Sequence, residues 1–111
     1  MYLKFHKSGN VVITYMMGEL DHHSAEEVRN KIDNRLDIEN ANKLIMNFEG
    51  VTFMDSSGIG VVIGRYKRLI RNGGNVCVTN VNETIKRVFE LSGMFKIIKL
   101  YDSIEEALNN I

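Results

Sequence analysis

Short apolar runs alternate with amphipathic stretches along the whole chain. Two strand-like runs, residues 2–6 and 11–17, flank the polar turn Lys7-Ser8-Gly9-Asn10, a pattern that predicts an antiparallel hairpin. Three further short apolar runs have the length of strands, and amphipathic segments with helical spacing lie between and after them. These strands are expected at 43–48, 76–79 and 95–100, and the helices at about 25–37, at 58–72, from Asn80 to Ser92-Gly93, and after Ser103.

Three of the four expected helices begin with a polar residue that is followed three positions later by a glutamate. This spacing is a capping box, in which the first side chain accepts a hydrogen bond from the start of the helix. The three pairs are Ser24 with Glu27, Asn80 with Glu83, and Ser103 with Glu106.

The order of elements predicts an α/β fold, β-β-α-β-α-β-α-β-α. Strands that alternate with helices pair in parallel through right-handed crossovers, whereas the first hairpin adds an antiparallel pair. We therefore expect a mixed sheet of four to five strands with about four helices. No linker, repeat or low-complexity tract divides the sequence, so residues 1–111 are expected to form one domain.

The expected helix at 58–72 has two unusual features. Gly60 and Gly64 lie four residues apart on one face, a costly choice in a helix unless a neighbouring backbone approaches closely. We therefore expect tight packing of these glycines on the sheet. The basic residues Arg65, Lys67 and Arg68 near its end are expected to face solvent.

Composition excludes several kinds of partner. Lysine plus arginine and aspartate plus glutamate each number 14, so the formal net charge is zero. This balance provides no overall positive field for nucleic acid or an anionic membrane. The apolar runs are far shorter than the ~20 residues that span a bilayer, and the first residues do not resemble a signal peptide. We therefore expect a cytoplasmic protein that binds any partner through a limited surface patch and not through its overall charge.

Metal and cysteine chemistry are weakly supported. The single cysteine, Cys77, lies in an apolar run and is expected to be a small buried hydrophobe. Asp21-His22-His23 invites a metal hypothesis, but adjacent histidines in a loop point in different directions and His6 is the only other histidine. No phosphate-binding glycine motif is present. We expect neither a metal nor a cofactor.

The polar step Asp55-Ser56-Ser57 lies where an apolar run becomes a helix. A serine oxygen there could cap the helix, and a phosphate on that oxygen would meet the favourable end of the helix dipole. A small serine hydrolase is the competing hypothesis, with His22 or His23 as the base. The flanks lack G-x-S-x-G, which makes catalysis the weaker alternative. The chain is expected not to be an enzyme.

Three segments of the chain carry recognisable motifs: residues 52–67 with D-S-S-G at 55–58, residues 18–27 with G-E-L-D-H-H at 18–23, and L-S-G-M-F-K-I-I at 91–98. The first two lie at the expected distance from each other. Together they resemble the STAS-domain anti-sigma factor antagonists, and the resemblance covers essentially the whole chain. It implies a STAS-type domain that acts as an anti-anti-sigma factor. The unphosphorylated form would bind an anti-sigma factor and free a sporulation sigma factor.

The resemblance also implies the switch and its residues. The anti-sigma factor would be a serine kinase that binds ATP itself and phosphorylates Ser56, with Ser57 as the fallback acceptor. A serine phosphatase would restore the unphosphorylated form. We expect Asp21, the loop after it and the start of the helix to share one docking face, because loops that follow sheet strands gather at one edge. A STAS module of another stress or signalling pathway is the alternative. The expected docking residues are Asp21, His22, His23, Asp55, Ser57, Gly58 and Ile59.

Overall fold

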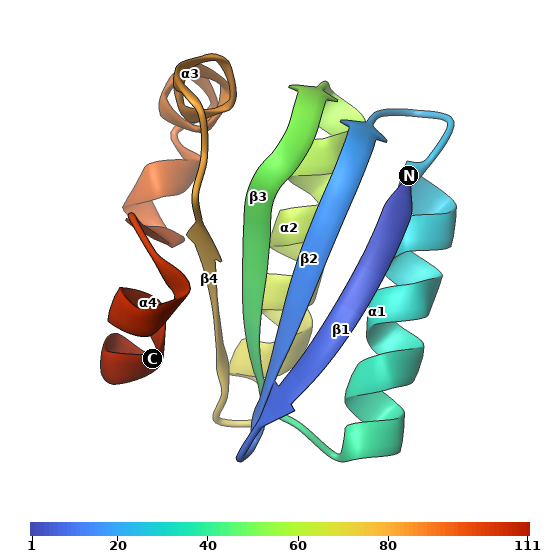
Figure 1. Ribbon diagram of the computed structural model, residues 1–111, viewed down its shortest axis with the longest axis vertical. Helices are drawn as coiled ribbons and strands as arrows, with labels where there is room; N and C mark the ends of the chain where they lie inside the picture. The colour runs from blue at the N-terminus through green and yellow to red at the C-terminus, as the bar shows by residue number, and fades with distance from the viewer.

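A five-stranded sheet runs through the computed structural model, which describes all 111 residues (Figure 1). The strands lie in the spatial order β1-β2-β3-β4-β5, and the predicted order of elements is confirmed. The strands are β1 (Tyr2–Ser8), β2 (Val11–Leu20), β3 (Lys43–Met54), β4 (Asn75–Thr79) and β5 (Lys99–Tyr101). The helices are α1 (Ala25–Glu39), α2 (Ser56–Ile70), α3 (Glu83–Ser92) and α4 (Ile104–Asn110), with a short 3-10 helix η1 (Met94–Lys96).

The sheet is mixed, as the sequence predicts. β1 pairs antiparallel with β2 through a turn in which Gly9 adopts a positive φ of 61°, and the other three pairings are parallel. Helices α1 and α2 lie together behind the sheet, whereas α3 and α4 lie on the side of β4 (Figure 1).

β2 and β3 extend well beyond the other strands. The sequence predicts that β3 ends at Phe48, but it continues to Met54, and its last residues pair with the end of β2 across two register shifts. The prediction was too short because Glu49 and Gly50 interrupt the apolar pattern. Gly50 lies against β2, where an added Cβ would be 2.8 Å from the Met16 carbonyl oxygen. The parallel pairing places Leu20 beside Met54, so the loops that follow both strands start side by side.

Two cores lie on opposite faces of the sheet. The larger one contains the buried faces of α1, α2 and α3, and the smaller one is covered by α4. Phe48 and Phe89 meet edge to face in the larger core, with ring centroids 5.6 Å apart. Cys77 is buried in the smaller core, which confirms its prediction as an apolar residue, and burial raises the pKa of its thiol to about 12.

The predicted last strand is wrong in its placement. Residues 94–96 form η1 after Gly93, which adopts a φ of 74°, and β5 begins only at Lys99. Residues 95–100 include four apolar residues and have the length of a strand whether or not they pair, so the sequence pattern alone does not separate the two conformations. Phe95 and Ile97 are about half exposed as a result.

Two of the three expected capping boxes are also wrong. Ser24 makes no capping hydrogen bond to α1, because its hydroxyl donates instead to the Glu19 carbonyl oxygen at 2.8 Å. The cap of α3 is Asn82 rather than Asn80, which adopts a left-handed φ of 58° before the helix. Ser103 does cap α4, accepting from the Glu106 N–H at 3.1 Å.

The expected packing of Gly60 and Gly64 is wrong as well. A Cβ added to either glycine would meet nothing within 4 Å, so both lie on the open face of α2. The close approach occurs instead at Gly58, where an added Cβ would be 2.8 Å from the Leu20 carbonyl oxygen. The sequence pattern identified a glycine face but not which side of the helix meets the sheet.

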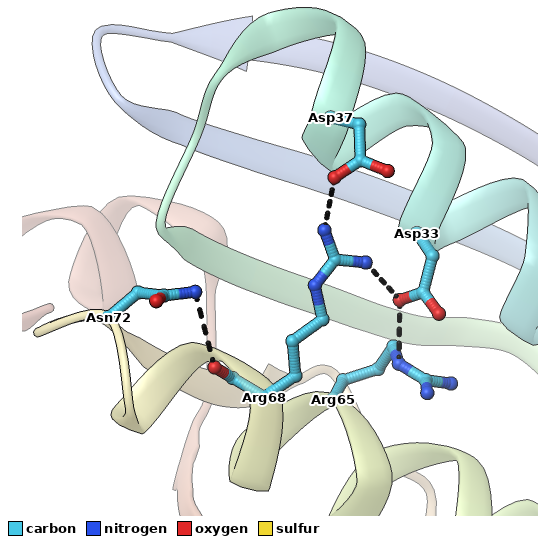
Figure 2. A network of polar contacts seen from close by, with 5 residues as sticks. All are labelled: Asp33, Asp37, Arg65, Arg68 and Asn72. Carbon is cyan, nitrogen blue, oxygen red and sulfur yellow. Dashed lines mark hydrogen bonds and ion pairs between the residues drawn. The ribbon is translucent and has the colours of Figure 1, made fainter.

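Arg65 is buried, which contradicts its expected position in solvent. It is only 6% exposed, and its Nε lies 2.9 Å from Asp33 Oδ1 of α1. Arg68 Nη1 lies at the same distance from that oxygen, and the other end of its guanidinium pairs with Asp37 (Figure 2). The Arg65 contact has ion-pair distance without hydrogen-bond geometry, so its attraction is mainly electrostatic. A carboxylate on the neighbouring helix makes this burial tolerable.

Candidate functional site

The ends of β2 and β3 bring two distant segments of the chain together. The Asp55 N–H lies 3.4 Å from the Leu20 carbonyl oxygen, and the His22 N–H donates to Asp55 Oδ2 at 3.2 Å. The predicted proximity of the Asp21 loop and the start of α2 is therefore observed. The hydrogen bonds between the two segments join Asp55 to the backbone of Leu20 and His22.

Asp55, not a serine, caps α2. Its backbone is extended, with φ −110° and ψ −168°, and its Oδ1 accepts from the N–H groups of Ser57 at 2.8 Å and Gly58 at 3.4 Å. The helix starts at Ser56, two residues earlier than the sequence predicts. The expectation of a serine cap failed because aspartate is an equally good cap and stands one position earlier.

The two serines differ in exposure. Ser56, the first helical residue, is exposed, and its hydroxyl is not needed for the cap that Asp55 provides. Ser57 and Ile59 are half-buried. Gly58 is buried against the end of β2, where the helix turns closely past the Leu20 carbonyl oxygen. Among these residues, Ser56 presents the most accessible nucleophilic oxygen.

Asp21 organises its own loop. Its Oδ1 accepts from the N–H groups of His23 at 2.9 Å and Ser24 at 3.1 Å, and the Ser24 hydroxyl accepts from the Asp21 N–H at 3.1 Å. Partial desolvation raises the pKa of the Asp21 carboxyl, but the hydrogen bonds from Ser24 and His23 outweigh this effect and lower the pKa below its ordinary value. The carboxylate therefore stays ionised and holds the turn.

His22 and His23 are exposed, and their rings lie edge to face with centroids 5.7 Å apart. The contact from this loop to α2 is made by the His22 backbone N–H, not by an imidazole ring. A serine hydrolase needs a ring nitrogen in reach of the serine oxygen, so this arrangement gives the hydrolase hypothesis no support.

Sequence reasoning missed the double role of Asp55. It was expected to lie on the docking face, but the same carboxylate both caps α2 and bonds the Asp21 loop. The signal available in the sequence was an aspartate directly before a serine pair at a strand end, which indicates a cap. The second bond depends on the parallel register of β2 and β3 and was not accessible from local pattern.

The model of the STAS domain family matches residues 2–107. The chain belongs to the STAS-domain family. An anti-sigma F factor antagonist from Paenibacillus polymyxa is 38% identical to this STAS domain over 101 residues, which cover 91% of this chain and 86% of the relative. An anti-sigma F factor antagonist from Lysinibacillus sphaericus is 40% identical over 83 residues, 75% of this chain and 71% of the relative.

Solved structures agree with the relatives. The anti-sigma factor antagonist SpoIIAA in its unphosphorylated form matches this STAS domain with a TM-score of 0.83 and 33% identity, covering 97% of this chain and 94% of the other. SpoIIAA from Bacillus in the phosphorylated form matches with a TM-score of 0.74 and 33% identity, covering 97% of each chain. This STAS domain is thus of the anti-sigma factor antagonist type. None of its helices has the length and apolar character to cross a membrane.

Proposed function

We propose that this STAS domain is an anti-anti-sigma factor controlled by phosphorylation of Ser56. The bare protein binds an anti-sigma factor in the cytoplasm and releases a sporulation sigma factor. The anti-sigma factor is also a serine kinase that supplies ATP, and a serine phosphatase removes the phosphate. The relatives named anti-sigma F factor antagonists and the solved phosphorylated form of SpoIIAA support this assignment.

The observation that carries the proposal is the exposed Ser56 hydroxyl at the first position of α2. A kinase can reach this oxygen without opening the helix, since Asp55 satisfies the N–H groups of Ser57 and Gly58. Transfer forms a bond between Ser56 Oγ and the γ-phosphorus of ATP, breaks the bond to ADP, and passes the hydroxyl proton to a base on the kinase. Ser57, which is half-buried, is the fallback acceptor.

The docking face comprises Asp21, His22, His23, Asp55, Ser57, Gly58 and Ile59 around Ser56. A phosphate adds about −1.5 to −2 charges beside the Asp55 carboxylate, on a surface that must lose water when a partner docks. Changing the protein from mostly bound to mostly free needs only about 3 to 5 kcal/mol, less than the cost of burying an unpaired dianion. Repulsion and desolvation at the interface therefore suffice, with no change of fold.

The test combines the protein with its cognate anti-sigma kinase and ATP, followed by mass spectrometry of the modified peptide and a binding assay. We expect one phosphate on Ser56 and binding of the modified protein that is weaker by at least about a hundredfold, the factor that corresponds to about 3 kcal/mol. Ser56→Ala should bind and remain unmodified, whereas the matched control Ser57→Ala should be phosphorylated normally.

Phosphate on Ser57, or equal binding by the bare and phosphorylated forms, would contradict the proposal. The same assay with kinases of sporulation and of general-stress pathways separates the sporulation role from the alternative of another partner-switching pathway. Labelling by a fluorophosphonate probe would instead support the hydrolase hypothesis.

A further inference from the structure

One carboxylate joins the two halves of the candidate docking face. Asp55 Oδ1 accepts from the N–H groups of Ser57 and Gly58 at the start of α2, and Oδ2 accepts from the His22 N–H at 3.2 Å. The other side-chain bonds of the 21–24 loop do not reach α2: His23 and Ser24 donate to Asp21 Oδ1, and the Ser24 hydroxyl donates to the Glu19 carbonyl oxygen of β2. The Asp21 loop is therefore tied to α2 by a side chain at a single point.

The backbone around this point supports the link but does not replace it. The Asp55 N–H reaches the Leu20 carbonyl oxygen at 3.4 Å, and Gly58 packs against the same oxygen. Both contacts involve the end of β2, before the loop begins. Beyond Leu20, the His22–Asp55 hydrogen bond is the one hydrogen bond that joins residues 21–23 to the start of α2, while the Ser24 hydroxyl holds the other end of the loop to β2.

We propose that Asp55 is a positioning residue, whose carboxylate fixes the Asp21 loop against the start of α2, and that a phosphate on Ser56 loosens this link. The second part rests on the proposed function. The phosphate is attached to the residue directly after Asp55 and carries the same sign of charge. Like-charge repulsion drives the two groups apart, and Oδ2 is held by the His22 N–H alone at 3.2 Å, whereas Oδ1 is held by two N–H groups, one of them at 2.8 Å.

Asp55→Asn tests the positioning role without phosphate. An asparagine oxygen can still accept from Ser57 and Gly58, since asparagine is an excellent cap, but its NH₂ group cannot accept from His22. We expect the His22 amide hydrogen to exchange about tenfold faster in the variant, the factor expected for loss of one hydrogen bond to a charged group. The helix and the melting temperature should change little.

The chain provides internal controls. The amides of His23 and Ser24 bond to Asp21 and should exchange at the same rate in Asp55→Asn as in the natural protein. Asp21→Ala should give the reverse pattern, with faster exchange at His23 and Ser24. Asp55→Ser, which keeps a cap but has a side chain too short to serve both sites, should reproduce the effect of Asp55→Asn.

Protein phosphorylated at Ser56 tests the second part by the same NMR measurement. Faster exchange at His22 with unchanged His23 and Ser24 supports the loosened link. An unchanged His22 rate in Asp55→Asn overturns the positioning role, and an unchanged rate in the phosphorylated protein overturns the effect of phosphate. Failure of the proposed function is distinct, because it appears in the anti-sigma factor binding assay and not in amide exchange.

Discussion

Gly58 and Gly60 lie two residues apart in α2 but in opposite surroundings. Gly58 is buried against the Leu20 carbonyl oxygen and the Met54 side chain, whereas a Cβ at Gly60 would meet nothing within 4 Å. Gly58 is therefore required for the helix to approach the end of β2. Gly60 is not required by any contact within the chain, although glycine weakens a helix by about 1 kcal/mol.

This contrast predicts opposite effects of one substitution. Gly58→Ala should destabilise the fold by about 1 to 2 kcal/mol, because a carbonyl oxygen cannot move away as a flexible side chain would. Gly60→Ala should stabilise it by about 0.5 to 1 kcal/mol through helix propensity. Urea denaturation of the two variants measures both changes, and equal effects would contradict the packing at Gly58.

At the scale of elements, ion pairs join α1 to α2 (Figure 2). Burial lowers the pKa of the Arg65 guanidinium, and the Asp33 carboxylate opposes that shift. Arg65 Nη1 is buried without a hydrogen-bond partner, so the arginine depends on Asp33 for its compensation. Asp37 pairs only with Arg68, and its side chain is 68% exposed.

The two aspartates should therefore differ in their contribution to stability. Asp33→Ala leaves the Arg65 charge buried without its carboxylate and should cost about 2 to 3 kcal/mol, somewhat below a fully buried pair because water reaches Asp33. Asp37→Ala, the matched control, should cost less than about 0.5 kcal/mol. Thermal denaturation compares them, and similar losses would show that burial of Arg65 does not need Asp33.

Local pattern was sufficient for the type and order of the elements but not for contacts between them. The hairpin, the four helices and the mixed sheet followed from periodicity and turn residues. The Asp33–Arg65 pair, the contact of Gly58 with Leu20 and the His22–Asp55 bond each join residues more than 30 positions apart in the sequence. The last two also depend on the register between β2 and β3. For the site, the proximity of the Asp21 loop and the start of α2 was predictable, whereas the division between capping and exposed side chains was not.

At the scale of the whole molecule, the two cores share the same strands. Leu44 and Val76 face the larger core, and their neighbours Ile45 and Cys77 face the smaller one. β3 and β4 therefore cannot separate without exposing both cores. This arrangement favours a single cooperative unfolding transition.

Cys77 provides a probe of that cooperativity. Its thiol is buried and has a pKa of about 12, so the native protein should resist alkylation by iodoacetamide at neutral pH. A short alkylation pulse at increasing urea should give the same midpoint as circular dichroism. Labelling at lower urea would mean that α4 detaches before the sheet unfolds.

Because the Asp55 carboxylate caps α2, the Ser56 side chain is not needed to form the start of the helix. Position 56 can thus receive alanine, threonine or a phosphorylated serine while the helix keeps its first turn. Under the proposed function, the residue that signals and the residue that caps the helix are therefore neighbours in the sequence, and substitutions at position 56 would change the sensitivity of the switch without destabilising the fold.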